Sequence, residues 1–117
     1  MRRDMDLIRL LLFEVEDEKE VDLSNYTEEE IVYNKALLIR KKFCRGSVAK
    51  DSHGKVDAAH IISLEWEGHY FLDAARDNKI WEKVKKKIIS TGTAFTISII
   101  LEMLKKELRN KFGLSRE

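Results

Sequence analysis

The segment 58–77, AAHIISLEWEGHYFLDAARD, changes from one hydrophobic periodicity to another within a few residues. Its first part is a short apolar run with the alternation of a half-buried strand, and its second part has apolar residues at helical spacing. A strand that passes directly into an amphipathic helix is typical of the last strand of a winged-helix hairpin. We therefore predict a two-stranded hairpin that is held in place by Trp66 and Phe71.

Capping signals predict the helices that precede this hairpin. A first helix is expected over 4–16, because its apolar residues recur at helical spacing and aspartates stand at the positive end of its dipole. Thr27, with Glu30 three residues later, has the signature of a capping box. The second helix is therefore expected to begin at Thr27 and to continue to Lys42 or Phe43.

The remaining elements complete the predicted fold. The turn residues of KDSHGK separate two strands, which gives a hairpin over 43–64. Further helices are expected over 65–75, 78–90 and 96–112. We predict an α+β fold, with a winged-helix (winged helix-turn-helix-like) domain over 1–77. Two additional C-terminal helices in 78–117 are expected to pack on this domain or to form a dimer interface.

The composition indicates a folded and highly charged chain. Charged residues make up 37% and apolar residues 44%, with no proline and one cysteine, Cys44. A single cysteine excludes an internal disulfide and fits a reducing cytoplasm. No apolar run approaches the roughly 18 residues of a membrane span. We expect a soluble, cytoplasmic protein.

The charge is distributed unevenly along the chain. The first 39 residues carry five basic and eleven acidic side chains, and the last 39 residues carry ten basic and four acidic ones.

A transcriptional regulator that binds duplex DNA is the first functional hypothesis, because winged helices often bind DNA through a recognition helix and a basic wing. The polar and basic residues that would make this surface are Asn34, Arg40, Lys41, Arg45, Lys50 and Lys55. Glu28, Glu29 and Glu30 argue against it, since phosphates would be repelled at the start of the helix. The connector 17–26 also leaves little room for the extra helix of a helix-turn-helix.

A protein–protein adaptor is the alternative hypothesis. Tyr33 and Leu37 lie one helical turn apart and place apolar surface where base contacts would be expected. The winged-helix surface would then hold a protein partner and no DNA. A second basic surface could attract phosphates regardless of sequence, although a solvated helix face is the preferred explanation. Its residues are Lys79, Lys83, Lys86, Lys87, Lys105, Lys106, Arg109 and Lys111.

Homodimerisation is expected from the last helix. One apolar stripe of this helix can pack within the chain, whereas Phe95, Ile99 and Met103 form a second stripe on its opposite side. A twofold copy of the chain is the commonest partner for such a face. The alternative is that the helix lies inside a layered core.

No residue set predicts catalysis, a metal or a cofactor. His53, His60 and His69 lack ligand spacing and form no zinc pattern with Cys44. A lone cysteine at a helix end is usually a small hydrophobic residue. The segment STGT lacks the rest of a phosphate-binding loop. We therefore expect a protein that is not an enzyme.

The sequence also resembles a known family. MRRDMDLIR, EEIVYNKALLI and WEGHYFLDAARDNKIWEKVKKKI are similar, in this order, to bacterial and prophage proteins catalogued as domain of unknown function 2513. The resemblance implies a winged-helix fold and a phage or mobile-element context, but no activity and no functional residues. The second helix of such proteins usually ends in a Gly-Leu-Ile-like step, where this chain has Lys42, Phe43 and Cys44.

Overall fold

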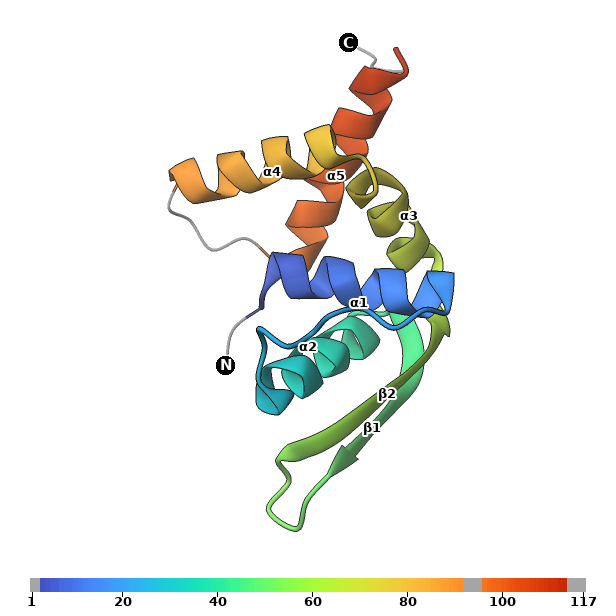
Figure 1. The fold of residues 1–117 in the computed structure, drawn as a ribbon, viewed down its shortest axis with the longest axis vertical. Helices are drawn as coiled ribbons and strands as arrows, with labels where there is room; N and C mark the ends of the chain where they lie inside the picture. Colours follow the sequence, from blue (N-terminus) through green and yellow to red (C-terminus); the bar gives the residue numbers. More distant parts are fainter. Residues whose placement is uncertain (1–2, 92–95, 114–117) are drawn as a thin grey trace. The chain divides into compact units, whose positions relative to one another are not determined.

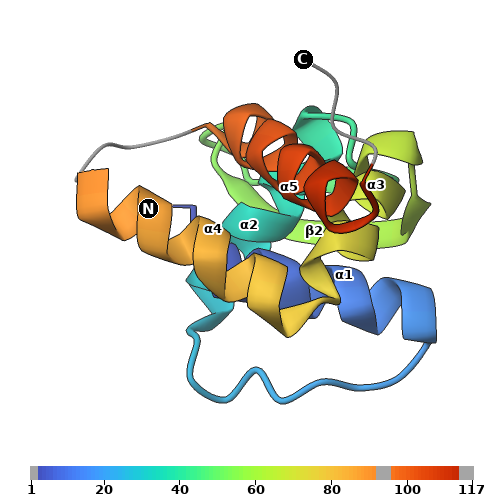
Figure 2. The same ribbon diagram turned by 90° about the horizontal axis from the view of Figure 1, so that it is seen from above.

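The computed structural model describes residues 3–91 and 96–113 (Figures 1 and 2). These residues form an α+β fold with five helices and one two-stranded antiparallel sheet. The chain divides into two compact units, Met1–His69 and Tyr70–Glu117. The elements in chain order are α1 (Met5–Asp17), α2 (Glu28–Arg40), β1 (Cys44–Lys50), β2 (Val56–Leu64), α3 (Trp66–Ala75), α4 (Asn78–Thr91) and α5 (Ile97–Lys111).

Helix α1 begins at the predicted aspartate. The Asp4 carboxylate caps the helix by accepting a hydrogen bond of 3.0 Å from the Leu7 amide. Apolar side chains on two successive turns are buried, namely those of Leu7, Ile8, Leu11 and Leu12. The chain then runs from α1 to α2 as an open loop, as Figure 2 shows. Residues 18–27 contain no helix, so the connector lacks the extra helix of a helix-turn-helix.

The predicted capping box of α2 is confirmed. The Thr27 amide donates to the Glu30 carboxylate over 2.9 Å, and the Glu30 amide donates to the Thr27 hydroxyl over 3.1 Å. These two bonds satisfy backbone donors that a helix start leaves without partners.

Helix α2 ends at Arg40, which is earlier than the predicted end at Lys42 or Phe43. The Lys42 amide donates to the Ile39 carbonyl and the Phe43 amide to the Leu38 carbonyl, which together form a Schellman motif. Lys42 has a φ of 65° and occupies the left-handed position of this motif. This is the position at which the family resemblance places glycine.

The predicted hairpin is confirmed. Strands β1 and β2 pair antiparallel, with an irregularity in register near each end of β1. The Asp51 carboxylate closes the connecting loop by accepting hydrogen bonds from the His53 and Lys55 amides. Helix α2 packs on the hairpin at close range: a Cβ on Gly46 would lie 2.1 Å from the His60 carbonyl oxygen and 3.0 Å from a methyl group of Ile39.

The start of α3 contacts the backbone of Phe43, the residue that follows the left-handed Lys42 at the end of α2. The Phe43 carbonyl accepts a 2.9 Å hydrogen bond from the Glu65 amide, and a Cβ on Gly68 would lie 2.1 Å from the same oxygen. The predicted role of Trp66 as a pin is wrong, because its side chain is 76% exposed. Gly68 takes this role by allowing close backbone contact.

The second unit is built on α4 and α5. The Phe71 ring packs edge-on against the fully buried Trp81 at a centroid distance of 5.9 Å. Helix α5 begins at the predicted N-cap, where the Thr96 hydroxyl accepts a 3.2 Å hydrogen bond from the Ile99 amide. Its buried face includes Glu107, whose carboxylate pairs with lysines of α4.

Candidate functional site

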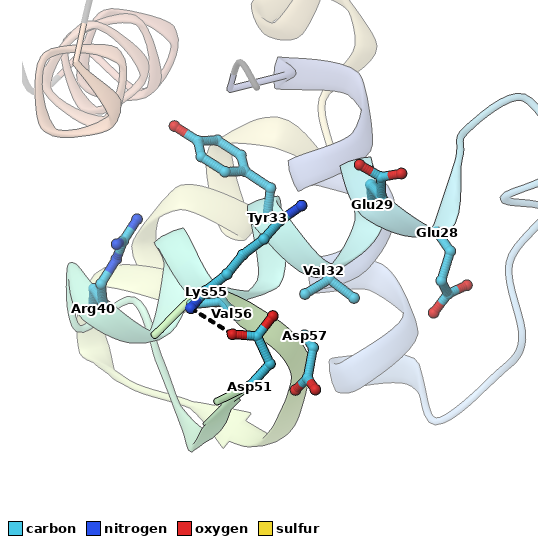
Figure 3. A pocket seen from close by; sticks show the side chains of 10 residues that line it. Glu28, Glu29, Val32, Tyr33, Arg40, Asp51, Lys55, Val56 and Asp57 are labelled. Carbon is cyan, nitrogen blue, oxygen red and sulfur yellow. Dashed lines mark hydrogen bonds between the residues drawn. The ribbon is translucent and has the colours of Figure 1, made fainter. Parts of the chain in front are cut away.

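An open groove of about 490 Å³ lies between one face of α2 and the tip of the hairpin (Figure 3). Volumes of this order, roughly 300–1,000 Å³, are usual for ligand sites. The lining residues on α2 follow one side of the helix, and those on the hairpin come from the loop and the start of β2. The α2 residues are Glu28, Glu29, Val32, Tyr33, Ala36 and Arg40, and the hairpin residues are Asp51, Lys55, Val56 and Asp57.

The floor of the groove is apolar. Val32 and Tyr33 on α2 and Val56 on β2 are each partly buried, and Ala36 is buried. Val32 and Ala36 lie four residues apart, so they stack along one side of the helix. The floor can therefore bury one apolar face of a ligand.

The rim of the groove is charged, and its two ends carry charges of opposite sign. Glu28 and Glu29 lie at one end and Arg40 lies at the other, as Figure 3 shows. The hairpin adds two carboxylates and one ammonium group between these ends, those of Asp51, Asp57 and Lys55. Carboxylates thus outnumber cations four to two around the groove.

The groove brings together only some of the residues that the sequence predicted as a binding surface. Tyr33, Arg40 and Lys55 line it. Leu37 is partly buried but does not line the groove.

Asn34 lies in the interior, which removes it from the predicted binding surface. Its side chain is fully buried. The amide oxygen accepts a 3.0 Å hydrogen bond from the Asp4 backbone amide, and the amide nitrogen donates to the Glu30 carbonyl over 2.9 Å. Asn34 thus connects the start of α1 to α2.

Most of the basic residues predicted for the wing and the end of α2 lie outside the groove. Lys41, Arg45 and Lys50 are exposed, but none of them lines the groove. Lys55 lines the groove, between Asp51 and Asp57 in chain order.

Ion pairs occupy part of the predicted basic surface of the second unit. The Lys83 and Lys87 ammonium nitrogens each lie 3.0 Å from an oxygen of the buried Glu107 carboxylate. Burial raises the pKa of Glu107, but hydrogen bonds from the two lysines outweigh this effect, so its pKa is lowered overall. The Lys111 ammonium pairs with Asp77, whose pKa is lowered chiefly by that hydrogen bond.

The predicted dimer residues on α5 have different surroundings. Ile99 is 45% exposed, and Met103 is partly buried. Phe95 lies outside the described residues. The buried face of α5 is the other predicted stripe, which includes Ile97, Ile100, Leu101 and Leu104.

Cys44 is a core residue. It is 2% exposed, and burial raises the pKa of its thiol to about 12. A thiol with this pKa carries almost no nucleophilic thiolate at neutral pH. Over residues 3–91 and 96–113, no three histidine, cysteine or acidic side chains gather as a metal site.

Sequence reasoning missed the two hairpin carboxylates of the groove, Asp51 and Asp57. They are 23 and 29 residues from Glu28 in the sequence, and only the packing of the hairpin on α2 brings them to the same rim. The available signal was their position close to the predicted hairpin turn, where polar residues are expected in any case.

Comparison with known proteins identifies the family. No solved structure matches the chain significantly. An uncharacterised protein from Haemophilus influenzae is 24% identical over 112 residues, which cover 88% of this chain and 92% of that protein. Of the helices that the structure describes, none is long and apolar enough to cross a membrane. The family model described as "Hypothetical protein (DUF2513)" matches residues 2–94, so the chain belongs to the DUF2513 family.

Proposed function

We propose that this chain is a non-catalytic adaptor that holds a protein partner in the groove between α2 and the hairpin. The single observation that carries the proposal is the combination of an apolar floor with a rim in which carboxylates outnumber cations. Duplex DNA presents closely spaced phosphates, so its binding depends on neutralisation by lysine and arginine. At this groove the nearest carboxylates would oppose phosphate, whereas an apolar protein segment would be buried against the floor.

The proposed adaptor keeps part of a winged-helix layout. Two helices, a hairpin and a further helix follow one another in the order expected from the sequence. The connector 18–27, however, contains no helix to complete a helix-turn-helix. We therefore propose a winged-helix-like fold whose α2–hairpin surface serves protein recognition. The cytoplasmic location and the phage context implied by the family resemblance remain predictions.

Site-specific photo-cross-linking tests the adaptor proposal. A photoreactive amino acid at Val32, on the groove floor, should form a defined covalent adduct with a protein in cells that naturally produce the chain. The same group at Ser47, an exposed position of β1 outside the groove, is the matched control. Tyr33→Ala in the Val32-labelled chain should abolish the adduct. Equal adducts from both positions, or an adduct that survives Tyr33→Ala, would reject the groove as the binding site.

A mobility-shift assay tests the DNA hypothesis directly. We expect no retention of mixed-sequence duplex DNA by the wild-type chain at low salt. Retention that Arg40→Glu with Lys41→Glu abolishes would contradict the adaptor proposal and restore the recognition-helix hypothesis.

Homodimerisation through α5 is a separate proposal, supported by the exposure of Ile99. Ile99→Glu with Met103→Glu should halve the mass measured by light scattering, because charged side chains disfavour an apolar interface. A wild-type chain that is already monomeric at high concentration would refute this proposal.

A further inference from the structure

The groove has two chemically different ends, which restricts the kind of segment it can hold. Glu28 and Glu29 lie on the first turn of α2, and Arg40 is the last residue of that helix. At 1.5 Å per residue these ends are about 18 Å apart. An extended peptide advances about 3.3 Å per residue, so five or six residues would span this distance.

The floor between the two ends is apolar along α2. Val32 and Tyr33 are followed one turn later by Ala36, and Val56 lines the groove from the start of β2. The middle residues of an extended segment would therefore place apolar side chains on this floor. Alternate side chains of the segment would point away from the floor, because successive residues of a strand face opposite sides.

We propose that the groove binds an extended segment of another protein with a cationic end, an apolar middle and an anionic end. This inference rests on the proposed adaptor function and specifies its ligand. The cationic end would lie at Glu28 and Glu29, and the anionic end at Arg40. A uniformly basic segment would meet Arg40 and Lys55, and a uniformly acidic one would meet the four carboxylates of the rim. Charge complementarity of this kind selects among partners and fixes their register.

The hairpin adds negative charge to the middle of the rim, between the two ends. Asp57 comes directly after Val56 at the start of β2, so it adds a carboxylate beside the apolar floor. Asp51 is fixed in place by two backbone amides of the hairpin loop, those of His53 and Lys55, at 2.8 and 3.0 Å. The carboxylates of the rim therefore come from both walls of the groove.

A set of synthetic hexapeptides tests this inference on the full chain. The probes are KKVLEE, its reversed sequence EEVLKK, and the uniform controls KKVLKK and EEVLEE, each with blocked ends. NMR titration should move the backbone amide signals of Val32, Tyr33 and Val56 with one or both bipolar peptides. Binding should weaken as salt increases, because exposed charges are screened. The uniform peptides should bind about two- to fivefold more weakly for each charge placed opposite a like charge.

Charge-neutralising variants supply the second measurement. Glu28→Gln with Glu29→Gln should weaken binding of the better bipolar peptide by about two- to fivefold for each charge removed. The matched control is Glu20→Gln, which removes an exposed carboxylate of the connector. Circular dichroism verifies that each variant is folded.

Four results would overturn the inference. They are no amide shift with either bipolar peptide, equal binding of uniform and bipolar peptides, equal effects of the groove and control variants, or the same amide shifts on concentrating the chain alone. The last result would identify a second copy of the chain as the occupant. If photo-cross-linking at Val32 still gives a protein adduct, any of these results would reject only the bipolar ligand. The adaptor function would then still be supported.

Discussion

Replacing Lys83 and Lys87 by methionine should destabilise the second unit more than replacing Glu107 by glutamine. The Glu107 side chain is only 7% exposed, whereas the two lysine side chains are 59% and 49% exposed. A lysine that loses Glu107 therefore stays hydrated. A carboxylate that loses both lysines stays buried without a cation, which is the more costly outcome.

The magnitude follows from this difference in burial. Removing one side of a buried ion pair costs about 3–5 kcal/mol when a charge is left uncompensated. We expect a loss near the lower end, about 3 kcal/mol, for the double methionine variant, because slight exposure lets the Glu107 carboxylate keep some hydration. Glu107→Gln keeps an oxygen acceptor for one ammonium group and should cost about 1 kcal/mol. In the Glu107→Gln background, the two lysine substitutions should then cost only about 1 kcal/mol, because they remove the one hydrogen bond that remains and leave no buried charge.

Urea unfolding followed by tryptophan fluorescence measures these losses. Trp81 is fully buried in the second unit, whereas Trp66 belongs to the first unit and is 76% exposed. A Trp66→Phe background therefore makes the remaining fluorescence report on the second unit. Lys86→Met, at an exposed position of α4, is the matched control and should change the free energy of unfolding little.

The result that would refute this reasoning is a double methionine variant as stable as the Lys86→Met control.

The ion pairs of Glu107 with Lys83 and Lys87 also predict that stability depends on pH. The pKa of Glu107 is lowered in the folded chain, so its stabilising contribution is present above the unfolded pKa of about 4.3. The contribution is lost as pH falls through the folded pKa. The stability difference between the wild type and Glu107→Gln should therefore shrink below about pH 4.

The remaining predictions concern the first unit. Lys42→Gly should raise the free energy of unfolding by about 0.5 to 1 kcal/mol in urea unfolding, because glycine adopts the observed φ of 65° without steric cost. Gly68→Ala should lower it by about 2 to 3 kcal/mol, because the new Cβ would lie 2.1 Å from the Phe43 carbonyl oxygen. Cys44 should react with iodoacetamide at pH 8 at least about tenfold more slowly in the folded chain than in urea, since its thiol is buried and its pKa is raised to about 12.

Each of these predictions has a contradicting outcome. A Lys42→Gly chain less stable than the wild type would mean that the lysine side chain contributes more than its backbone conformation costs. An unchanged Gly68→Ala chain would mean that α3 can move away from Phe43 without loss. Equal alkylation of Cys44 in the two conditions would show that the folded core opens readily around this thiol.

Local signals in the sequence predicted the starts of elements well. The Thr27–Glu30 capping box, the Thr96 N-cap and the turn residues before Val56 act over three or four residues, so the sequence contains everything that they require. The predicted end of α2 was wrong because nothing in a lysine side chain marks a left-handed residue. Lys42 takes that conformation as part of a motif whose following residue, Phe43, is buried.

The burial of particular polar and aromatic residues could not be predicted from periodicity. Asn34 interrupts the surface expected for α2 because the start of α1 supplies a backbone donor to it. Glu107 lies on the buried face of α5 because two lysines of α4 reach it. Trp66 was predicted to pin the hairpin, yet it is exposed. These outcomes depend on contacts between distant segments, as does the meeting of Asp57 with α2 in the groove.

The acidic first turn of α2 links the rim of the groove to the integrity of the helix. Glu28, Glu29 and Glu30 stand at the positive end of the helix dipole, and Glu30 also closes the capping box with Thr27. Each reversal to lysine would forfeit a favourable dipole interaction of about 0.3–1 kcal/mol and replace it by a repulsive one. Substitutions that made the start of α2 basic enough to bind nucleic acid would therefore destabilise α2 itself. Such a change would require compensating mutations elsewhere in the first unit.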